Sequence, residues 1–170
     1  TLSDFTFTGA SQTSLTVYTT TGNITLNNVD VNDQANGRNT ALLNSASGDI
    51  TVTNGTFDGN NSNSAGFSAT TGSGSITISD SSFTENRSPT PANTSDGATL
   101  NAPIVTLTNV TATGNDGNGV TINGANIVTL NSVVASSNGT DLTPAGFTNN
   151  VGSGVFFNGN VGSNLFINGG

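Results

Sequence analysis

GDITVTNGTFDGN, residues 48–60, is the stretch that decides the fold. Ile50 and Val52 alternate with threonines, which is the pattern of a β-strand with one buried face. Asn54 and Asn60 follow the strand, with Phe57 between them. If the stretch is one turn of a repeated coil, asparagines would be expected at fixed places such as these.

The same pattern recurs at intervals of 26, 26, 29 and 23 residues. The other copies are ITLNNVDVND from Ile24, ITISDSSFTEN from Ile76, VTLTNVTATGN from Val105 and VTLNSVVASSN from Val128, with a degraded first copy, LSDFTFTGA, from Leu2 and a truncated last copy, LFIN, from Leu165. Each unit also holds a second, shorter apolar stretch, and variable Gly/Ser/Asn/Pro segments separate the two. Insertions confined to one place in each repeat are typical of solenoids.

The repeat predicts strands rather than helices, because apolar residues alternate with period two and β-branched residues dominate. A strand advances about 3.3 Å per residue, so one repeat can form three short strands and three bends. Stacked coils form parallel sheets, whose crossovers are right-handed in nearly all proteins. We therefore predict an all-β fold: a right-handed parallel β-helix of about six coils, each of roughly 23–29 residues with loop insertions, forming a single domain over residues 1–170 with uncapped ends.

Aligned repeats place apolar residues in three inward columns that we expect to form the core. These columns are Ile24, Ile50, Ile76, Val105 and Val128; Leu2, Leu26, Val52, Ile78, Leu107 and Leu130; and Phe7, Val31, Phe57, Phe83, Ala112 and Ala135.

Two further columns are polar and fall at predicted bends. The first holds Asp4, Asn28, Asn54, Asp80, Asn109 and Ser132; the second holds Asn60, Asn86, Asn115 and Asn138, with Gln34 roughly in line. Such side chains can bond backbone groups at a bend and the equivalent residue one coil away, so we interpret both columns as structural ladders. N-glycosylation is the alternative, since several of these asparagines also read as Asn-x-Ser/Thr.

An outward row of threonines accompanies the strands. It consists of Thr25, Thr51, Thr77, Thr106 and Thr129, flanked by Asn27, Thr53, Ser79, Thr108 and Asn131. Threonine is a common outward residue on a sheet, which is the plainer explanation. The alternative is a hydroxyl lattice that resembles the T-x-T arrays of ice-binding solenoids, although polar substitutions interrupt it.

Composition excludes several classes of function. The net charge of −8, with two arginines and no lysine, leaves no basic surface for nucleic acid or an anionic membrane. Absence of cysteine and histidine excludes thiol nucleophiles, histidine bases, zinc sites built on these residues and disulfides, and we expect no cofactor. The chain has no transmembrane run or signal peptide, so it looks mature or excised from something longer. A polar but weakly charged surface favours an extracellular or cell-surface location.

The acidic residues Asp33, Asp58 and Glu85 lie near one edge of three successive coils and form a weak calcium candidate. Two carboxylates about 5 Å apart would also suit a retaining glycosidase. Arg38 and Arg87 follow in the loops, however, so surface ion pairing explains the acids equally well. We expect no enzyme activity and no metal.

The run NVTATGNDGNGVTINGANIVTLNSVVASSN resembles the parallel β-helix repeats of pectin-lyase-like proteins and large bacterial surface proteins, including adhesins. The resemblance covers nearly the whole chain. It implies the fold but no particular activity, because this fold carries lyases, hydrolases, adhesins and inert fibres. The basic catalytic residue and paired Asp motifs that the resemblance would imply for pectate lyases and polygalacturonases are not found.

Uncapped solenoid ends expose strand edges and core side chains. The sequence begins and ends at the same phase of the coil, and Leu2, Phe5, Phe7, Phe157, Leu165 and Ile167 could form a junction between copies. We therefore expect an extracellular structural protein that stacks head to tail into a filament or surface fibre, with itself as partner. The alternative is an adhesin or carbohydrate-binding segment of a larger surface protein, with cell-surface or environmental polysaccharide as partner.

Overall fold

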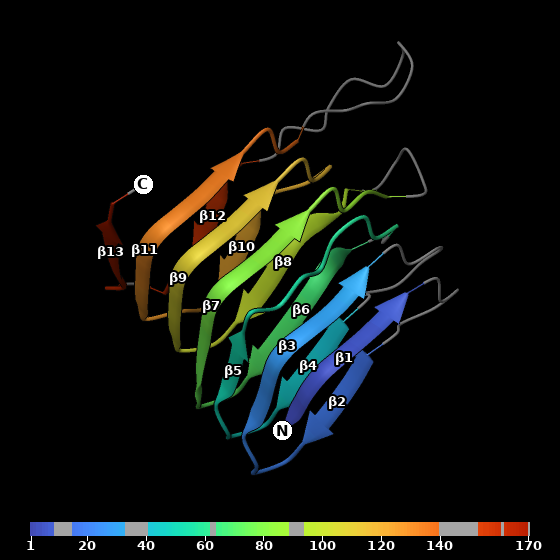
Figure 1. Cartoon of the computed structure of the whole chain (residues 1–170). Coiled ribbons are helices and arrows are strands. Elements are labelled where there is room, and N and C mark those ends of the chain that lie inside the picture. The colour runs from blue at the N-terminus through green and yellow to red at the C-terminus, as the bar shows by residue number, and fades with distance from the viewer. Residues whose placement is uncertain are drawn as a thin grey trace.

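The structure is a computed structural model that describes residues 1–8, 15–32, 41–61, 64–88, 94–139, 153–160 and 162–169. Within these ranges all the regular secondary structure is β-strand, arranged in two parallel sheets (Figure 1). Gln34, Asp33 and Arg38 lie outside the described residues.

The chain alternates between the two sheets, so that strands adjacent in a sheet are never consecutive in sequence. The seven-stranded sheet has the order β1 (Leu2–Thr8), β3 (Ile24–Asn32), β5 (Ile50–Thr53), β7 (Ser75–Thr84), β9 (Ile104–Thr113), β11 (Ile127–Ser136) and β13 (Asn164–Asn168). The six-stranded sheet has the order β12 (Val155–Asn158), β10 (Val120–Asn123), β8 (Asp96–Asn101), β6 (Ala65–Thr71), β4 (Ala41–Ser45) and β2 (Leu15–Thr19).

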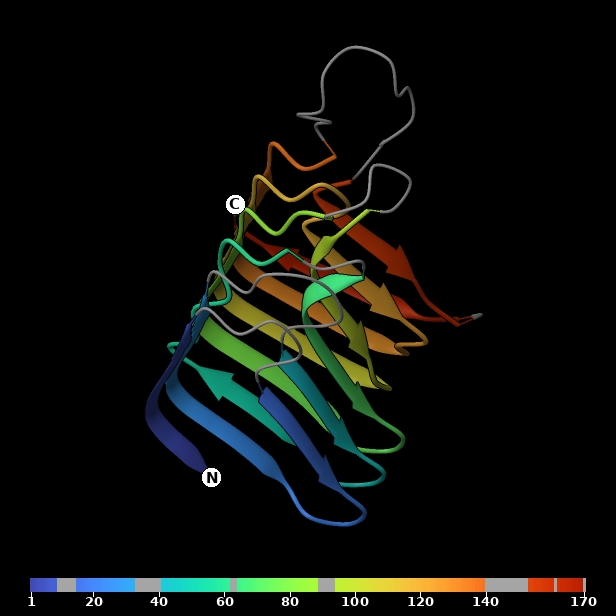
Figure 2. The ribbon, with the colours of Figure 1, turned by 90° about the vertical axis from the view of Figure 1, so that its right-hand side faces the viewer.

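The register of the strands follows the repeat. Ile50 of β5 pairs with Ile24 on one side and with Ile76 on the other. Every strand pair is parallel, so equivalent residues of successive repeats lie one above the other (Figure 2). The predicted parallel β-solenoid is confirmed.

The seven-stranded sheet is bent along its middle by the first polar column. In β3, Leu26 and Val29 are both buried, although a straight strand would turn residues three apart to opposite faces. Asn28 between them has φ of 55°, which re-aims the strand so that both of its halves present apolar residues inward. In the coil of β5 the half beyond the bend forms no strand of its own, and Thr56 bridges it to Asp30 on one side and to Ser82 on the other.

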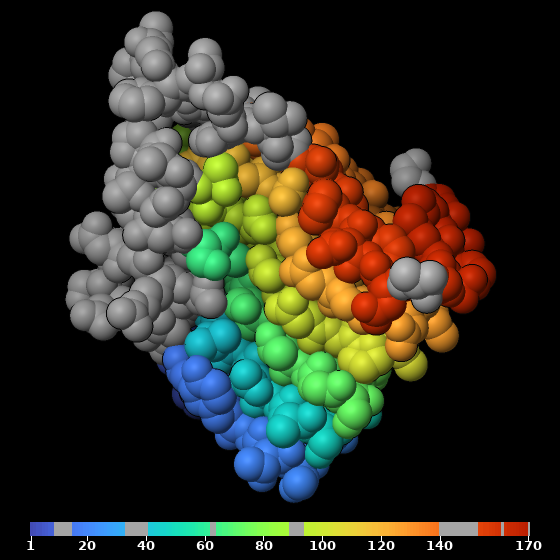
Figure 3. Space-filling view, turned by 180° about the vertical axis from the view of Figure 1, so that it is seen from behind, coloured from blue at the N-terminus to red at the C-terminus, as the bar shows by residue number. Residues whose placement is uncertain are grey.

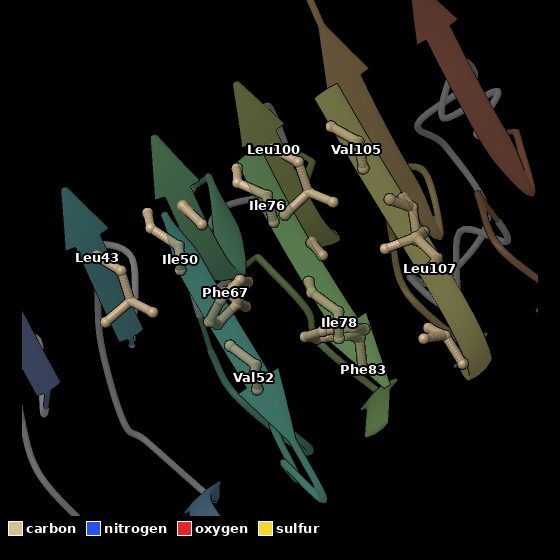
Figure 4. Packing of buried hydrophobic residues seen from close by; sticks show 14 of the residues in the cluster. Leu43, Ile50, Val52, Phe67, Ile76, Ile78, Phe83, Leu100, Val105 and Leu107 are labelled. Atoms are coloured by element: carbon tan, nitrogen blue, oxygen red, sulfur yellow. The ribbon is translucent and has the colours of Figure 1, made fainter. Parts of the chain in front are cut away.

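The core lies between the two sheets, and alternate residues of both fill it (Figure 4). Its widest side chains are Phe57, Phe67 and Phe83, whose ring centroids are 4.7–5.4 Å apart. The column of Phe57 and Phe83 continues as Ala112, so the core uses smaller residues toward the C-terminal coils.

Four turns of the coil, β3–β4, β5–β6, β7–β8 and β9–β10, have neighbours on both sides in both sheets. The outer turns each have an uncovered side. Figure 3 shows the coils as successive bands from the N-terminal to the C-terminal end of the stack. The part of the chain that the structure describes contains no helix of the length and apolarity needed to cross a membrane.

Candidate functional site

The second polar column is a continuous row of hydrogen-bonded amides inside the stack. Asn60 Nδ2 donates to Asn86 Oδ1 at 3.0 Å, Asn86 Nδ2 to Asn115 Oδ1 at 3.0 Å, and Asn115 Nδ2 to Asn138 Oδ1 at 2.9 Å. The side chains of Asn60, Asn86 and Asn115 are fully buried. We call these four residues the asparagine ladder.

Each amide of the ladder also bonds backbone groups of the preceding coil. Asn86 Nδ2 donates to the carbonyl of Phe57 at 3.0 Å, and Asn86 Oδ1 accepts the backbone N–H of Asn60 at 3.3 Å. Asn115 repeats the arrangement, donating to Phe83 at 2.9 Å. Burial and bonding leave no room for a glycan on Asn60 or Asn86 in the folded chain.

Glycines on the six-stranded side make room for the ladder. A Cβ atom at Gly66 would lie 2.2 Å from Asn86 Oδ1, and one at Gly97 would lie 2.7 Å from Asn115 Nδ2. These contacts are too short for any side chain. The asparagine ladder therefore requires glycine at the facing positions, Gly66 and Gly97.

The first polar column occupies the bend of the seven-stranded sheet. Its members Asp4, Asn28, Asn54, Asp80, Asn109 and Ser132 all have φ between 51° and 58°. Asn and Asp tolerate this left-handed conformation better than other residues with a side chain. Asn28 Nδ2 donates to Asp4 Oδ1 at 2.8 Å, and Asn109 Nδ2 to Asp80 Oδ1 at 2.7 Å. The column sets the direction of the chain and bonds between coils at these two pairs.

The five threonines of the outward row pair in an unbroken register. Thr51 pairs with Thr25 and Thr77, and Thr106 pairs with Thr77 and Thr129. The row continues to Phe166 of β13, where the hydroxyl pattern ends. All five threonines are half-buried rather than fully exposed.

Asp58 accepts hydrogen bonds from the next coil. Its Oδ1 accepts the backbone N–H of Thr84 at 2.9 Å, and both of its carboxylate oxygens accept the Ser82 hydroxyl at 3.2 Å. Glu85 forms an ion pair with Arg87 instead. No group of three or more His, Cys, Asp or Glu side chains that could hold a metal ion occurs among the described residues, which do not include Asp33.

A further ladder lies at the turns that lead from the six-stranded to the seven-stranded sheet, and sequence reasoning missed it. The hydroxyls of Ser45 and Thr71 accept the backbone N–H of Gly48 and Gly74, at 2.8 and 3.1 Å, within their own turns. They also donate one coil back, Ser45 to the carbonyl of Gly22 and Thr71 to that of Gly48. The available signal was a Ser/Thr-x-x-Gly pattern that recurs every 26 residues.

Asp49 lies directly before β5, and its side chain also accepts hydrogen bonds from the next coil. Its Oδ1 accepts the backbone N–H of Ser75 at 2.8 Å and the Ser75 hydroxyl at 2.9 Å. These two bonds favour the ionised form and lower the pKa of Asp49 from its ordinary value of 3.8. Asp49 and Asp58 are therefore engaged in holding coils together.

The N-terminal end of the stack is open and apolar. A hollow of about 310 Å³ lies there, lined mainly by Leu2, Phe7, Leu15, Val17, Ile24 and Leu26. Phe5 is 49% exposed, and its ring stacks on that of Phe7 with centroids 6.1 Å apart.

The C-terminal end is also uncovered. Leu165 and Ile167 of β13 pair with the core residues Val128 and Leu130, so they belong to inward columns, yet they are 44% and 68% exposed. Phe157 of β12 is half-buried and pairs with the core residue Ile122. Phe166 pairs with Thr129, so it belongs to the outward row.

The geometry defines a parallel β-solenoid with internal hydrogen-bond ladders and two apolar ends. No protein family, curated protein or solved structure matches the chain.

Proposed function

We propose that the chain is an extracellular structural protein, a subunit of a filament or surface fibre in which the first coil of one copy stacks on the last coil of another. The observation that carries the proposal is that both ends of the described stack leave core columns uncovered. Removal of such apolar surface from water favours association of the two ends.

The two ends offer matching columns. Leu2 at one end and Ile167 at the other belong to the column that runs through Leu26 and Leu130. Phe7 continues the column of Val31 at the first end, and at the last end that column closes with Ala135. A large ring at one end and a small side chain at the other are suited to contact across a junction.

The strands at the two ends carry no like charges that would repel each other across the junction. The carboxylates near the first end, Asp4 and Asp30, belong to β1 and β3, whereas β11, β12 and β13 at the last end carry no charged residue. Two unlike surfaces that meet in this way form a heterologous contact, and repetition of the contact without closure produces a filament.

The proposal is tested by imaging the purified chain in the electron microscope and by measuring its size by light scattering. Unbranched fibres are expected. Ile167→Lys places a charge in the junction and should abolish them. Phe166→Lys, on the outward row one residue away, is the matched control and should leave them intact. Both side chains are largely exposed, so neither change should unfold the subunit.

A chain that stays monomeric at all concentrations, or fibres that survive Ile167→Lys, would overturn the proposal. A monomer would favour the alternative, in which these residues are an adhesin or carbohydrate-binding segment of a larger surface protein of the pectin-lyase-like kind. The solenoid repeat supports that finer relationship, and the groove described below is the observation that favours carbohydrate binding.

Other activities have less support. The carboxylates Asp49 and Asp58 are occupied by bonds between coils, which gives little support to glycan cleavage or calcium binding. The threonine row is regular over five strands, but it is bordered by asparagines, and Phe166 ends it. Extracellular location is supported by the polar, weakly charged composition.

A further inference from the structure

A shallow groove of about 390 Å³ lies on the side of the stack, next to the turns that follow β6, β8, β10 and β12. Asparagines from three successive coils line it: Asn101, Asn123, Asn126 and Asn160. We call it the asparagine groove. It is separate from both open ends.

The register of the six-stranded sheet positions the amides. Asn123 pairs with Asn101 across adjacent strands, so their side chains stand one layer apart. Asn160 Nδ2 donates to Gly124 O at 2.7 Å and to Asn126 Oδ1 at 2.9 Å, which holds two of the groove side chains in place. The amide of Asn123 has no hydrogen-bond partner among the described residues, so its donors and acceptor are available to a ligand.

Two of the residues that line the groove are apolar. They are Ala102 and Pro103, and the Pro103 carbonyl accepts the backbone N–H groups of Asn126 and Ile127, at 2.8 and 3.2 Å. These bonds fix the turn of one coil against that of the next. The groove therefore combines apolar side chains with asparagine amides.

The chemistry of the lining selects the ligand class. None of the residues that line the groove is charged, so an ionic ligand would lose its hydration without gaining a counter-charge. Amides both donate and accept hydrogen bonds, which suits hydroxyl groups. Ala102 and Pro103 suit the C–H face of a ring.

We propose that the asparagine groove binds a neutral oligosaccharide. The inference does not depend on end-to-end stacking, because the groove belongs to the side of the stack. It names a site and a ligand class for the carbohydrate-binding alternative.

The test is a titration of the full 170-residue chain, isotope-labelled, with neutral hexasaccharides of glucose, mannose and N-acetylglucosamine and with an anionic oligogalacturonate. At least one neutral oligosaccharide should shift the side-chain amide signals of Asn123 and Asn126. The anionic oligosaccharide should not. Failure of every neutral oligosaccharide to bind, or stronger binding of the anionic one, would overturn the proposal.

Two variants locate the site. Asn123→Ala removes the available amide and should weaken binding roughly threefold to tenfold, the value of one hydrogen bond. Asn27→Ala removes an exposed asparagine from the other sheet and should leave affinity unchanged. Equal affinity of Asn123→Ala and the unaltered chain would contradict the assignment.

Gly124→Asn gives a steric test that preserves the fold. Gly124 has φ of 67°, which asparagine tolerates, and a Cβ atom there meets nothing within 4 Å. The new side chain should enter the groove and reduce binding at least tenfold. Gly169→Asn is the matched control, since Gly169 has φ of 66°, lies outside the groove, and a Cβ atom there would meet only Ser132 Oγ, at 3.9 Å. Undiminished binding by Gly124→Asn would place the ligand elsewhere.

Discussion

At the scale of single residues, the buried asparagines hold the coil together through hydrogen bonds that no other side chain reproduces. Asn86 donates two bonds, to Phe57 O and Asn115 Oδ1, and its own Oδ1 accepts from Asn60. An amide is required because the position needs both donors and an acceptor on one short planar group. The energetic weight of the ladder lies in the cost of leaving these partners buried without bonds.

Replacement of Asn86 by alanine should lower the free energy of unfolding by about 3 kcal/mol or more, because each buried polar group without a partner costs about 1–3 kcal/mol. Asn86→Asp keeps the shape but loses both donors, and should be at least as damaging at neutral pH. Urea denaturation measures both. Asn27→Ala, on the surface, should change stability by less than about 0.5 kcal/mol. A mild effect of Asn86→Ala would show that the ladder is dispensable.

Asp49 makes the free energy of unfolding depend on pH in the acidic range. Its pKa is lowered by the backbone N–H and then by the hydroxyl of Ser75, so its ionised form is favoured in the folded state. The stabilisation is present above the ordinary value of 3.8 and is lost as pH falls through the lower folded pKa. The difference in denaturation midpoint between the natural chain and Asp49→Asn should shrink from pH 5 toward pH 2. A difference that is constant with pH would contradict this role.

At the scale of the elements, the strands are packed so closely at some positions that only glycine fits. Gly97 at the start of β8 faces both the Gly119 carbonyl, at 2.5 Å from an added Cβ, and the ladder amide of Asn115. The contact is with backbone of the next coil, which cannot move without shifting the strand. Glycine at this position is therefore required by distance and not by a left-handed φ.

Gly97→Ala should destabilise the fold by about 2 kcal/mol or more, since overpacking a tight core commonly costs 1–3 kcal/mol. The matched comparison is Gly124→Ala, which meets no neighbouring atom but must adopt a positive φ, at a cost of about 1 kcal/mol. Thermal unfolding of the two variants separates steric overlap from backbone strain. Equal effects, or a smaller effect at Gly97, would show that the coils can move apart.

Sequence reasoning was strongest for these elements and weakest for what lies between them. The repeat of Ile24, Ile50 and Ile76 predicts the inward columns, because a period of two and an interval of 26 residues leave few other registers. The hydrogen bonds that Ser45 and Thr71 make at the turns, and the bonds of Asp58 to the next coil, were not predicted. Each depends on which backbone N–H of another coil faces the side chain, and that is determined by the turn geometry. The asparagine groove was missed for the same reason, since its lining comes from turns of unequal length.

At the scale of the whole molecule, stability and assembly depend on apolar surface and neutral hydrogen bonds. Charged residues make up 7% of the chain, and Arg87 with Glu85 is the only ion pair between described residues. The two ends expose apolar side chains and strand edges. Any association through these ends should therefore have a hydrophobic character.

The critical concentration for fibre formation should change by less than about threefold between 50 and 500 mM NaCl, because β11, β12 and β13 carry no charged residue that could pair with Asp4 or Asp30. Cooling should raise it, since the hydrophobic contribution weakens at low temperature. Sedimentation of fibres at several salt concentrations and temperatures measures both effects. Assembly that fails at high salt would point to ion pairing and away from the apolar ends.

The asparagine ladder has a direction. In each amide–amide bond from Asn60 to Asn138, the donor lies on the coil nearer the N-terminus and the acceptor on the next coil. A fibre in which the first coil of one copy stacks on the last coil of another is polar, because the amide–amide bonds of every subunit then run in the same direction. Its two tips are then chemically different and should elongate at different rates. The direction of such a fibre would be the same in every subunit and would follow the order of four asparagines, of which Asn60, Asn86 and Asn115 are fully buried.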